Sequence, residues 1–234
     1  MVFGSSATCK YRLTVKKSID NKNMNIFFGT DGWRAHIDTE INEETVSVVA
    51  QAFADFIHQD YKEKSPCVAL AYDTRKNSQL FATTFAEVLS GNRIQVLLSD
   101  RIAPTPVLSY ATLHLNCCAG VMITASHNPP SYNGIKFKSR LGGPFCSDDT
   151  RKIEQYLYAS PVVRSTSHIH KMNFIPAYVE HIEKRIDFEI IRKAALNILI
   201  DSMGGAGLTL IQEILHSHNC LAQSIYSEAS ETFH

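Results

Sequence analysis

A serine, a histidine and a lysine lie close together in one polar segment of this 234-residue sequence. Ser126 and His127 directly follow the apolar run 119–123, and Lys136 comes shortly afterwards. Because the apolar run predicts a buried strand, this segment lies at a strand end, where α/β proteins place their chemistry. A serine hydroxyl beside a cation can accept and hold a phosphoryl group. The segment therefore predicts phosphoryl transfer through Ser126.

Two further polar segments, residues 29–34 and 73–75, also follow predicted strands. Taken singly, each arginine in them is most often a surface or ion-pair residue. Taken together, Arg34, Ser126 and Lys136 could converge on one crevice at the strand ends. Guanidinium and ammonium groups there would stabilise a migrating phosphoryl group, whose charge spreads over its peripheral oxygens in the transition state.

The serine–histidine pair does not predict a hydrolase. Sequence neighbours rarely act as nucleophile and base to each other, because the base must approach from across the site. The nucleophile elbow G-x-S-x-G does not occur in the chain either. The other alternative is a plain Asn-Pro-Pro turn at residues 128–130. His127 and Lys136, on either side of this turn, make that interpretation less favourable.

The composition is that of an ordinary soluble globular protein, with 44% hydrophobic and 20% charged residues. Its 23 basic and 23 acidic residues balance, so we expect no large nucleic-acid surface, which needs a clustered basic face. The uncharged stretch between Arg101 and Lys136 contains prolines and polar residues, which indicates core and not a membrane span. The six cysteines form no C-x-x-C pair and predict reduced thiols in a cytoplasmic protein.

Strand-like and helix-like segments alternate along the chain. The expected strands are residues 26–28, 67–72, 94–98 and 119–123, and the expected helices include residues 42–61 and 78–89. Residues 134–138 alternate apolar and basic side chains, which predicts an antiparallel strand with one face in solvent. The order predicts a three-layer α/β/α domain with a mostly parallel mixed sheet, followed by the incomplete start of a second similar α/β domain.

Four parts are expected along the chain. Residues 1–23 are predicted to be a disordered extension, and residues 24–160 to form the first domain. Residues 161–175 are polar and without periodicity, which predicts a linker. Residues 176–234 contain one β-α-β unit, which is too small to close a core alone and predicts an incomplete second domain.

These residues resemble the α-D-phosphohexomutases, the family of the phosphoglucomutases and phosphomannomutases. Three motifs carry the resemblance, in the family's order: residues 28–35 (Phe-Gly-Thr-Asp-Gly-Trp-Arg-Ala), Asp-Thr-Arg at 73–75, and residues 124–136 with the Ser-His-Asn-Pro loop. It extends from about residue 25 to the end of the chain. Trp33 and the run 128–134 look more like the glucose and mannose branch than the phosphoglucosamine branch.

The resemblance implies an enzyme that interconverts hexose 1-phosphate and hexose 6-phosphate, of glucose or mannose, through a bound 1,6-bisphosphate. Ser126 resembles the serine that carries phosphate in the resting enzyme. His127, Lys136 and Arg34 match positions proposed for acid–base work and phosphate contact. The resemblance also implies Mg²⁺ as cofactor, with the phosphate on Ser126 as one of its ligands.

Some of the family's parts do not occur in this sequence. The aspartate-rich metal loop D-x-D-x-D-R, the sugar-binding loop and the R-x-S-x-T phosphate loop are absent. The resemblance therefore implies the N-terminal portion of a phosphohexomutase, expected to be inactive alone. The alternatives are a non-catalytic remnant that binds a phosphosugar or a partner protein, and a phosphoglucosamine mutase. A nucleotide-binding module at Gly205 is weaker still, because a tight turn explains residues 204–207 better.

Overall fold

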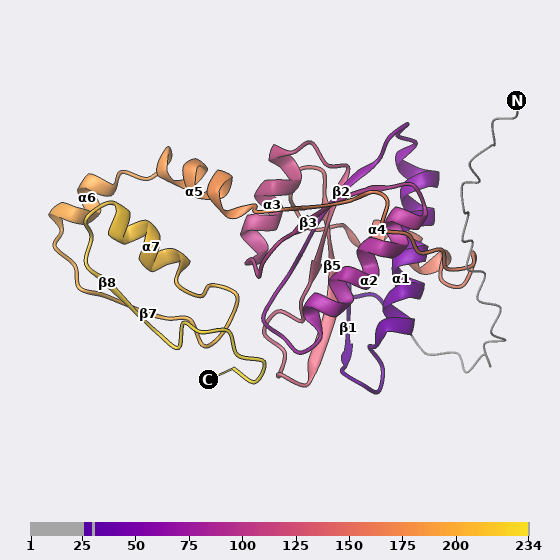
Figure 1. Ribbon diagram of the computed structural model, residues 1–234, viewed down its shortest axis with the longest axis horizontal. Coiled ribbons are helices and arrows are strands. Elements are labelled where there is room, and N and C mark those ends of the chain that lie inside the picture. The colour runs from indigo at the N-terminus through magenta and orange to yellow at the C-terminus, as the bar shows by residue number, and fades with distance from the viewer. Residues whose placement is uncertain (1–25, 30, 234) are drawn as a thin grey trace, which may run out of the picture.

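The structure is a computed structural model that describes residues 26–29 and 31–233. The extension predicted at residues 1–23 lies outside the described residues. Figure 1 shows two bodies joined by a single connection. The first body contains strands β1 to β6, and the second contains strands β7 and β8.

A six-stranded mixed sheet forms the centre of the first body within the described part of the chain, in the order β1-β5-β4-β2-β3-β6. Its strands are β1 (Trp33–His36), β2 (Cys67–Tyr72), β3 (Gln95–Ser99), β4 (Ala119–Ile123), β5 (Tyr132–Ser139) and β6 (Ile169–Met172). Strands β4, β2, β3 and β6 are parallel, and β5 is antiparallel to both of its neighbours. The mostly parallel mixed sheet and its antiparallel element are confirmed.

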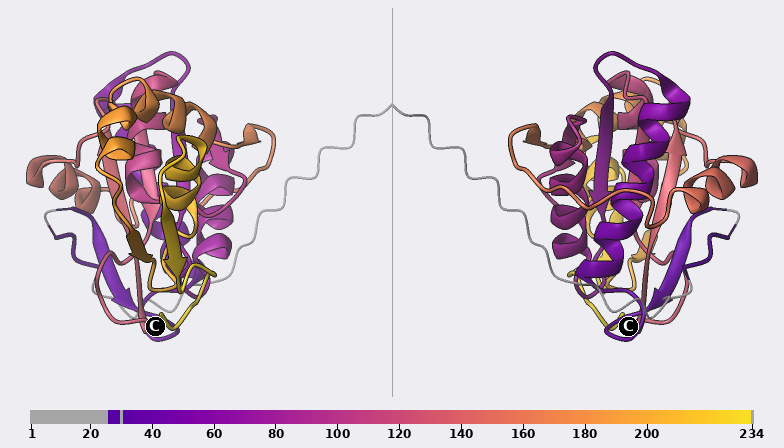
Figure 2. Two further views of the ribbon diagram at one scale, coloured as in Figure 1. Left: turned by 90° about the vertical axis from the view of Figure 1, so that its left-hand side faces the viewer. Right: turned by 90° about the vertical axis from the view of Figure 1, so that its right-hand side faces the viewer.

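Helices cover both faces of this sheet. They are α1 (Glu43–Phe56) with its π-helical continuation η1 (Ile57–Tyr61), α2 (Ser78–Gly91), α3 (Thr105–His114) and α4 (Ser147–Gln155). In the right-hand view of Figure 2, α1 runs down the near face with α2 and α4 on either side of it. Strand β2 shows why both faces are covered: Val68 and Leu70 belong to one buried cluster, and the alternating Ala69 and Ala71 belong to another.

Helix α1 begins with a reciprocal capping box. The Asn42 side chain accepts hydrogen bonds from the backbone N–H groups of Glu44 and Thr45, at 3.0 and 3.1 Å. In return the Asn42 N–H donates to Thr45 Oγ1 at 2.9 Å. These bonds satisfy donors that a helix start otherwise leaves unpaired.

Replacing Asn42 with alanine is expected to lower the free energy of unfolding by about 1 kcal/mol, because two helix-start N–H groups lose their acceptor. Urea unfolding followed by circular dichroism measures the change. Asn42→Asp retains an acceptor oxygen and is the matched control, expected within about 0.5 kcal/mol of the wild type. An alanine variant as stable as the wild type would contradict the role of the cap.

Residues 26–28 do not form a strand in the structure, so that prediction is wrong. The structure forms β1 at Trp33–His36 instead, which begins inside the polar segment 29–34 and extends two residues beyond it. Strand β1 pairs with β5 and places Arg34 opposite Gly134. A Cβ on Gly134 would lie 2.4 Å from the Trp33 carbonyl oxygen, so only glycine lets the two strands approach this closely. The open edge of β5, and not the three apolar residues, decides where the strand forms.

The segment predicted as a linker, residues 161–175, contains an edge strand of the first sheet. Strand β6 (Ile169–Met172) pairs in parallel with β3. Its central residues His170 and Lys171 are exposed, so the strand lacks the apolar pattern by which strands are recognised. Backbone groups on the free edge of β3 hold it in place.

The second body contains the predicted β-α-β unit. Its elements are α5 (Ile175–Glu183), α6 (Phe188–Lys193), β7 (Ile198–Asp201), α7 (Leu210–Ser217) and β8 (Ala222–Ile225), with the two strands parallel. Its buried cluster is small and is built around Phe188, Leu215 and Cys220. Leu199 on β7 and Leu221 before β8 are 64% and 67% exposed. Within the described residues, the strand face that carries these two leucines, together with Asp201 and Gln223, therefore remains uncovered.

Two observations concern the predictions made from composition. Among the described residues, no helix combines the length and the apolar character needed to cross a bilayer. The described cysteines are all free thiols: Cys67, Cys117, Cys118, Cys146 and Cys220. Cys9 lies outside the described residues.

Candidate active site

Ser126 lies just beyond the carboxyl end of β4 and is exposed. Its backbone has a φ of +59°, in the left-handed region that residues other than glycine rarely adopt. Its N–H donates to Thr124 Oγ1 at 2.9 Å, and its carbonyl oxygen accepts from Arg75 Nη2 at 2.9 Å. Hydrogen bonds on both sides of the residue therefore hold an unfavourable backbone conformation, which is a frequent feature of functional sites.

His127 is also exposed, and its Nδ1 lies 3.4 Å from Ser126 Oγ. This distance is at the long end for a hydrogen bond. The contact joins sequence neighbours, unlike the pair in a catalytic triad, where the base approaches from across the site. The arrangement leaves His127 within reach of a proton on Ser126 without making it a triad base.

Lys136 lies on β5, where its Nζ donates to Asp31 Oδ2 at 2.7 Å. Lys138, on the same face, has its Nζ 3.9 Å from Asp31 Oδ1. The prediction that this face lies in solvent is wrong, since the two lysines are only 9% and 7% exposed. Asp31 provides the countercharge that burial of an ammonium group requires. Burial also lowers the pKa of Lys138.

Two lysines share a single carboxylate at this position, so a net positive charge remains. Such a charge in a partly buried setting attracts anions. Asp31 was not among the predicted site residues, although it lies in the motif at residues 28–35. Its contact with Lys136 spans 105 residues of sequence, which no local pattern reveals.

Arg34 reaches the same loop from β1. Its Nη1 donates to Asn128 Oδ1 at 3.4 Å, and its side chain is exposed. A pocket of about 260 Å³ adjoins it, lined by Phe27, Gly29, Asp31, Gly32 and Arg34. The structure thus brings the predicted Arg34 to the serine loop and places a cavity beside the ion pair of Lys136 with Asp31.

Arg75 supports the loop from beneath and was not predicted as a site residue. Its guanidinium is buried and donates to four backbone carbonyl oxygens of the loop, those of Ser126, Asn128, Pro129 and Tyr132. Burial lowers the pKa of Arg75, while the neighbouring Asp73 opposes that shift. A guanidinium remains charged in such a setting. The sequence signal that could have identified it is an arginine three residues after the end of β2, in a motif shared with the family.

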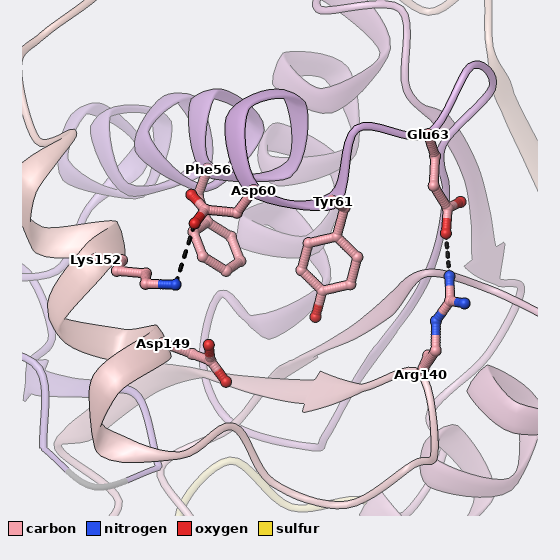
Figure 3. A pocket seen from close by; sticks show the side chains of 7 residues that line it. All are labelled: Phe56, Asp60, Tyr61, Glu63, Arg140, Asp149 and Lys152. Atoms are coloured by element: carbon pink, nitrogen blue, oxygen red, sulfur yellow. Dashed lines mark hydrogen bonds and ion pairs between the residues drawn. The ribbon is translucent and has the colours of Figure 1, made fainter.

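A second pocket, of about 360 Å³, lies near the amino ends of the parallel strands β2 and β4, away from Ser126 (Figure 3). It is lined by Phe56, Asp60, Tyr61, Glu63, Arg140, Asp149 and Lys152. Lys152 pairs with Asp60 at 3.1 Å, and Arg140 pairs with Glu63. Burial raises the pKa of Tyr61 to about 12. Because both cations already have partners, this pocket offers no excess positive charge to a phosphate.

The described residues do not by themselves fit the Mg²⁺ that the resemblance implies. Within residues 26–29 and 31–233, no group of three His, Cys, Asp or Glu side chains could hold a metal ion. Magnesium usually binds through one or two carboxylates together with phosphate oxygens and water. Asp31, the carboxylate near the site, is engaged by Lys136 and lies close to Lys138.

Comparisons with known proteins agree with this geometry. The family model of the phosphoglucomutase/phosphomannomutase α/β/α domain I matches residues 25–161. A phosphoglucomutase/phosphomannomutase of Thermococcus kodakarensis is 30% identical over 206 residues, which is 86% of this chain and 45% of that protein. A phosphoglucomutase of Staphylococcus aureus is 32% identical over 82% of this chain and 37% of its own length.

A solved structure described as a putative phosphomannomutase of Thermus thermophilus superimposes with a TM-score of 0.82 at 30% identity. The match covers 89% of this chain and 47% of that one. The chain therefore spans less than half the length of these relatives. The family match covers more than half of the chain and includes the strand, loop and cations described above, so the chain belongs to the phosphoglucomutase/phosphomannomutase family.

Proposed function

We propose that this chain forms the phosphoserine-bearing portion of an enzyme that interconverts hexose 1-phosphate and hexose 6-phosphate. Glucose and mannose are the proposed sugars, and the cytoplasm is the proposed location. The proposal depends mainly on the position of Ser126. It is exposed beyond the carboxyl end of β4, and hydrogen bonds to its N–H and its carbonyl oxygen hold its backbone conformation. Arg34 provides a positive charge at the same loop, and Lys136 provides a second on β5, the strand that follows the loop, where it pairs with Asp31.

The proposed reaction begins with a phosphoryl group on Ser126. The P–Oγ bond breaks as a P–O bond forms to the free hydroxyl of the hexose phosphate, which gives a 1,6-bisphosphate. The sugar hydroxyl loses its proton and Ser126 Oγ gains one; the proposed proton carrier is His127, whose Nδ1 lies 3.4 Å from Ser126 Oγ. The other phosphoryl group then returns to Ser126, which completes the exchange of positions on the sugar.

Lys136 and Arg34 have an electrostatic role in this scheme. Charge accumulates on the peripheral oxygens of the phosphoryl group as it transfers, and fixed cations stabilise it most where water is excluded. Lys136 is buried and oriented by Asp31, so it changes position little during the transfer. Arg34 is exposed, which suits contact with the phosphate that the incoming sugar already carries.

Mg²⁺ is the proposed cofactor of the complete reaction. When bound, it would neutralise part of the charge on the phosphoryl group, with the phosphate oxygen on Ser126 as one ligand. Among the described residues, no cluster of three His, Cys, Asp or Glu side chains would complete its coordination.

The experiment that tests this proposal measures phosphate on Ser126. The chain is incubated with glucose 1,6-bisphosphate, and intact mass spectrometry is expected to show one added phosphate. Ser126→Ala is expected to gain none, because the accepting oxygen is absent. Ser131→Ala, which removes another exposed serine of the same loop, is the matched control and should retain the gain.

Two outcomes would contradict the proposal. Phosphate added to the Ser126→Ala variant would place the modification on another residue. A wild-type chain that gains no phosphate would favour a phosphosugar-binding role without transfer. Steady conversion of glucose 1-phosphate to glucose 6-phosphate is not expected from this chain, because it lacks the family's sugar-binding and second phosphate-binding loops.

A further inference from the structure

We infer that Arg75 is a positioning residue for Ser126, whose loop it holds in place by binding four backbone carbonyl oxygens. It acts through the main chain of the loop and not on the transferred group. The functional part of this inference rests on the proposed function, whereas its structural part does not.

Both terminal nitrogens of the Arg75 guanidinium bind the loop. Nη1 donates to the carbonyls of Pro129 and Tyr132, both at 2.8 Å. Nη2 donates to those of Ser126 and Asn128, at 2.9 and 2.7 Å. The four N–H groups on these two nitrogens thus each find an acceptor. The Arg75 side chain is only 1% exposed, so the loop wraps closely over it.

The loop needs such a partner because it has little hydrogen bonding of its own. Two of its residues, Pro129 and Pro130, have no N–H to donate. Its internal backbone hydrogen bonds are short-range, from Asn128 N to Ala125 O and from Tyr132 N to Pro129 O. Carbonyl groups turned inward from such a loop must find donors, since buried polar groups in proteins are almost always paired. The Arg75 guanidinium alone supplies hydrogen-bond donors to the carbonyl groups of four loop residues.

Arg75 is itself tied to the end of β2. The Asp73 carboxylate lies 3.3 Å from Nε, and its other oxygen accepts from Arg75 N–H at 3.0 Å and Ser78 Oγ–H at 2.7 Å. The Nε contact is an ion pair, because the angle leaves that N–H without a hydrogen-bond acceptor among the described residues. The position of the loop therefore follows the position of the central sheet.

A residue of the second body covers the flat face of the same guanidinium. The Phe233 ring centroid lies 4.8 Å from Arg75 Cζ, a distance suited to a cation–π contact. The loop carbonyls thus bind the N–H groups at the edge of the guanidinium, and the Phe233 ring covers its face. Lysine carries the same charge on one nitrogen with three donors, so it cannot reproduce four directed bonds.

The test is hydrogen exchange measured by mass spectrometry on the full 234-residue chain. In Arg75→Lys, peptides covering residues 124–134 are expected to exchange about tenfold faster than in the wild type. Peptides from β2 and β4 should be unchanged. The matched control is Arg151→Lys on α4, an exposed arginine paired with Asp148, which should exchange like the wild type throughout.

Two results would overturn the structural part of the inference. Unchanged exchange in residues 124–134 would show that the loop does not depend on Arg75. An equal acceleration in β2 and β4 would show a general role in stability. If Arg75→Lys does not fold, Asp73→Asn replaces it, since it keeps the acceptor for the Arg75 N–H and removes the countercharge. A smaller acceleration confined to the loop is then expected, and its absence overturns the inference.

The functional part is tested by the rate at which Ser126 gains phosphate from glucose 1,6-bisphosphate. Arg75→Lys is expected to lower the rate at saturation about 100-fold, because a misplaced reacting atom loses its alignment. The half-saturating concentration should not change, since Arg75 touches no substrate. An unaltered rate in a variant whose loop exchanges faster overturns this part. Failure of the proposed function appears separately, as a wild-type chain that gains no phosphate.

Discussion

Replacing Lys136 with methionine is expected to slow phosphate transfer to Ser126 by about 100- to 1,000-fold, the usual effect of removing one directed positive group from a charge-stabilising site. Methionine occupies a similar volume, and Lys138 remains close to Asp31, so the fold should be retained. The transition state, however, loses a buried cation. Intact mass spectrometry after mixing with glucose 1,6-bisphosphate gives the rate.

Lys152→Met is the matched control for this change. Lys152 pairs with Asp60 in the pocket of Figure 3, near the amino ends of the parallel strands, and it is about half exposed. Its replacement should leave the rate of phosphate transfer as in the wild type. Equal slowing in the two variants, or no slowing in Lys136→Met, would show that the charge on Lys136 does not act on the transferred group.

Replacing Phe53 with alanine is expected to lower the free energy of unfolding by about 3–5 kcal/mol, because it leaves a cavity in a fully buried cluster. Phe53 on α1 has no exposed surface, and its ring stacks on Phe137 of β5 with centroids 4.7 Å apart. It also lies against Phe56, Phe85 and Phe145. Urea unfolding followed by circular dichroism measures the loss.

Phe27→Ala removes the same side chain from a position that is 72% exposed, and it is expected to change stability by no more than about 0.5 kcal/mol. Similar losses in the two variants would contradict the assignment of Phe53 to the core. Phe137 lies between Lys136 and Lys138 on β5, so the cavity would also loosen the strand that carries the buried lysines.

The alternating pattern of residues 134–138 is compatible with two structures, and the sequence does not distinguish them. A strand with basic residues on alternate positions is expected to expose them, since ammonium groups are costly to bury. Here the countercharge comes from Asp31, which is 105 residues away from Lys136 in the sequence. Because this ion pair compensates the charge, the lysines are buried and not exposed. The edge strands β1 and β6 show a similar limit, because each forms where a partner offers free backbone groups.

The sequence by itself determined the four inner strands β2, β3, β4 and β5, the family, and the loop that presents Ser126. Each of these depends on residues adjacent in the chain, such as an apolar strand that ends at a polar turn. Only the tertiary structure decided which groups surround that serine. Arg75 reaches the loop across 51 to 57 residues, and Asp31 reaches Lys136 across 105. The physical reason is that hydrogen bonds and ion pairs depend on distance in space, which folding sets and local spacing does not encode.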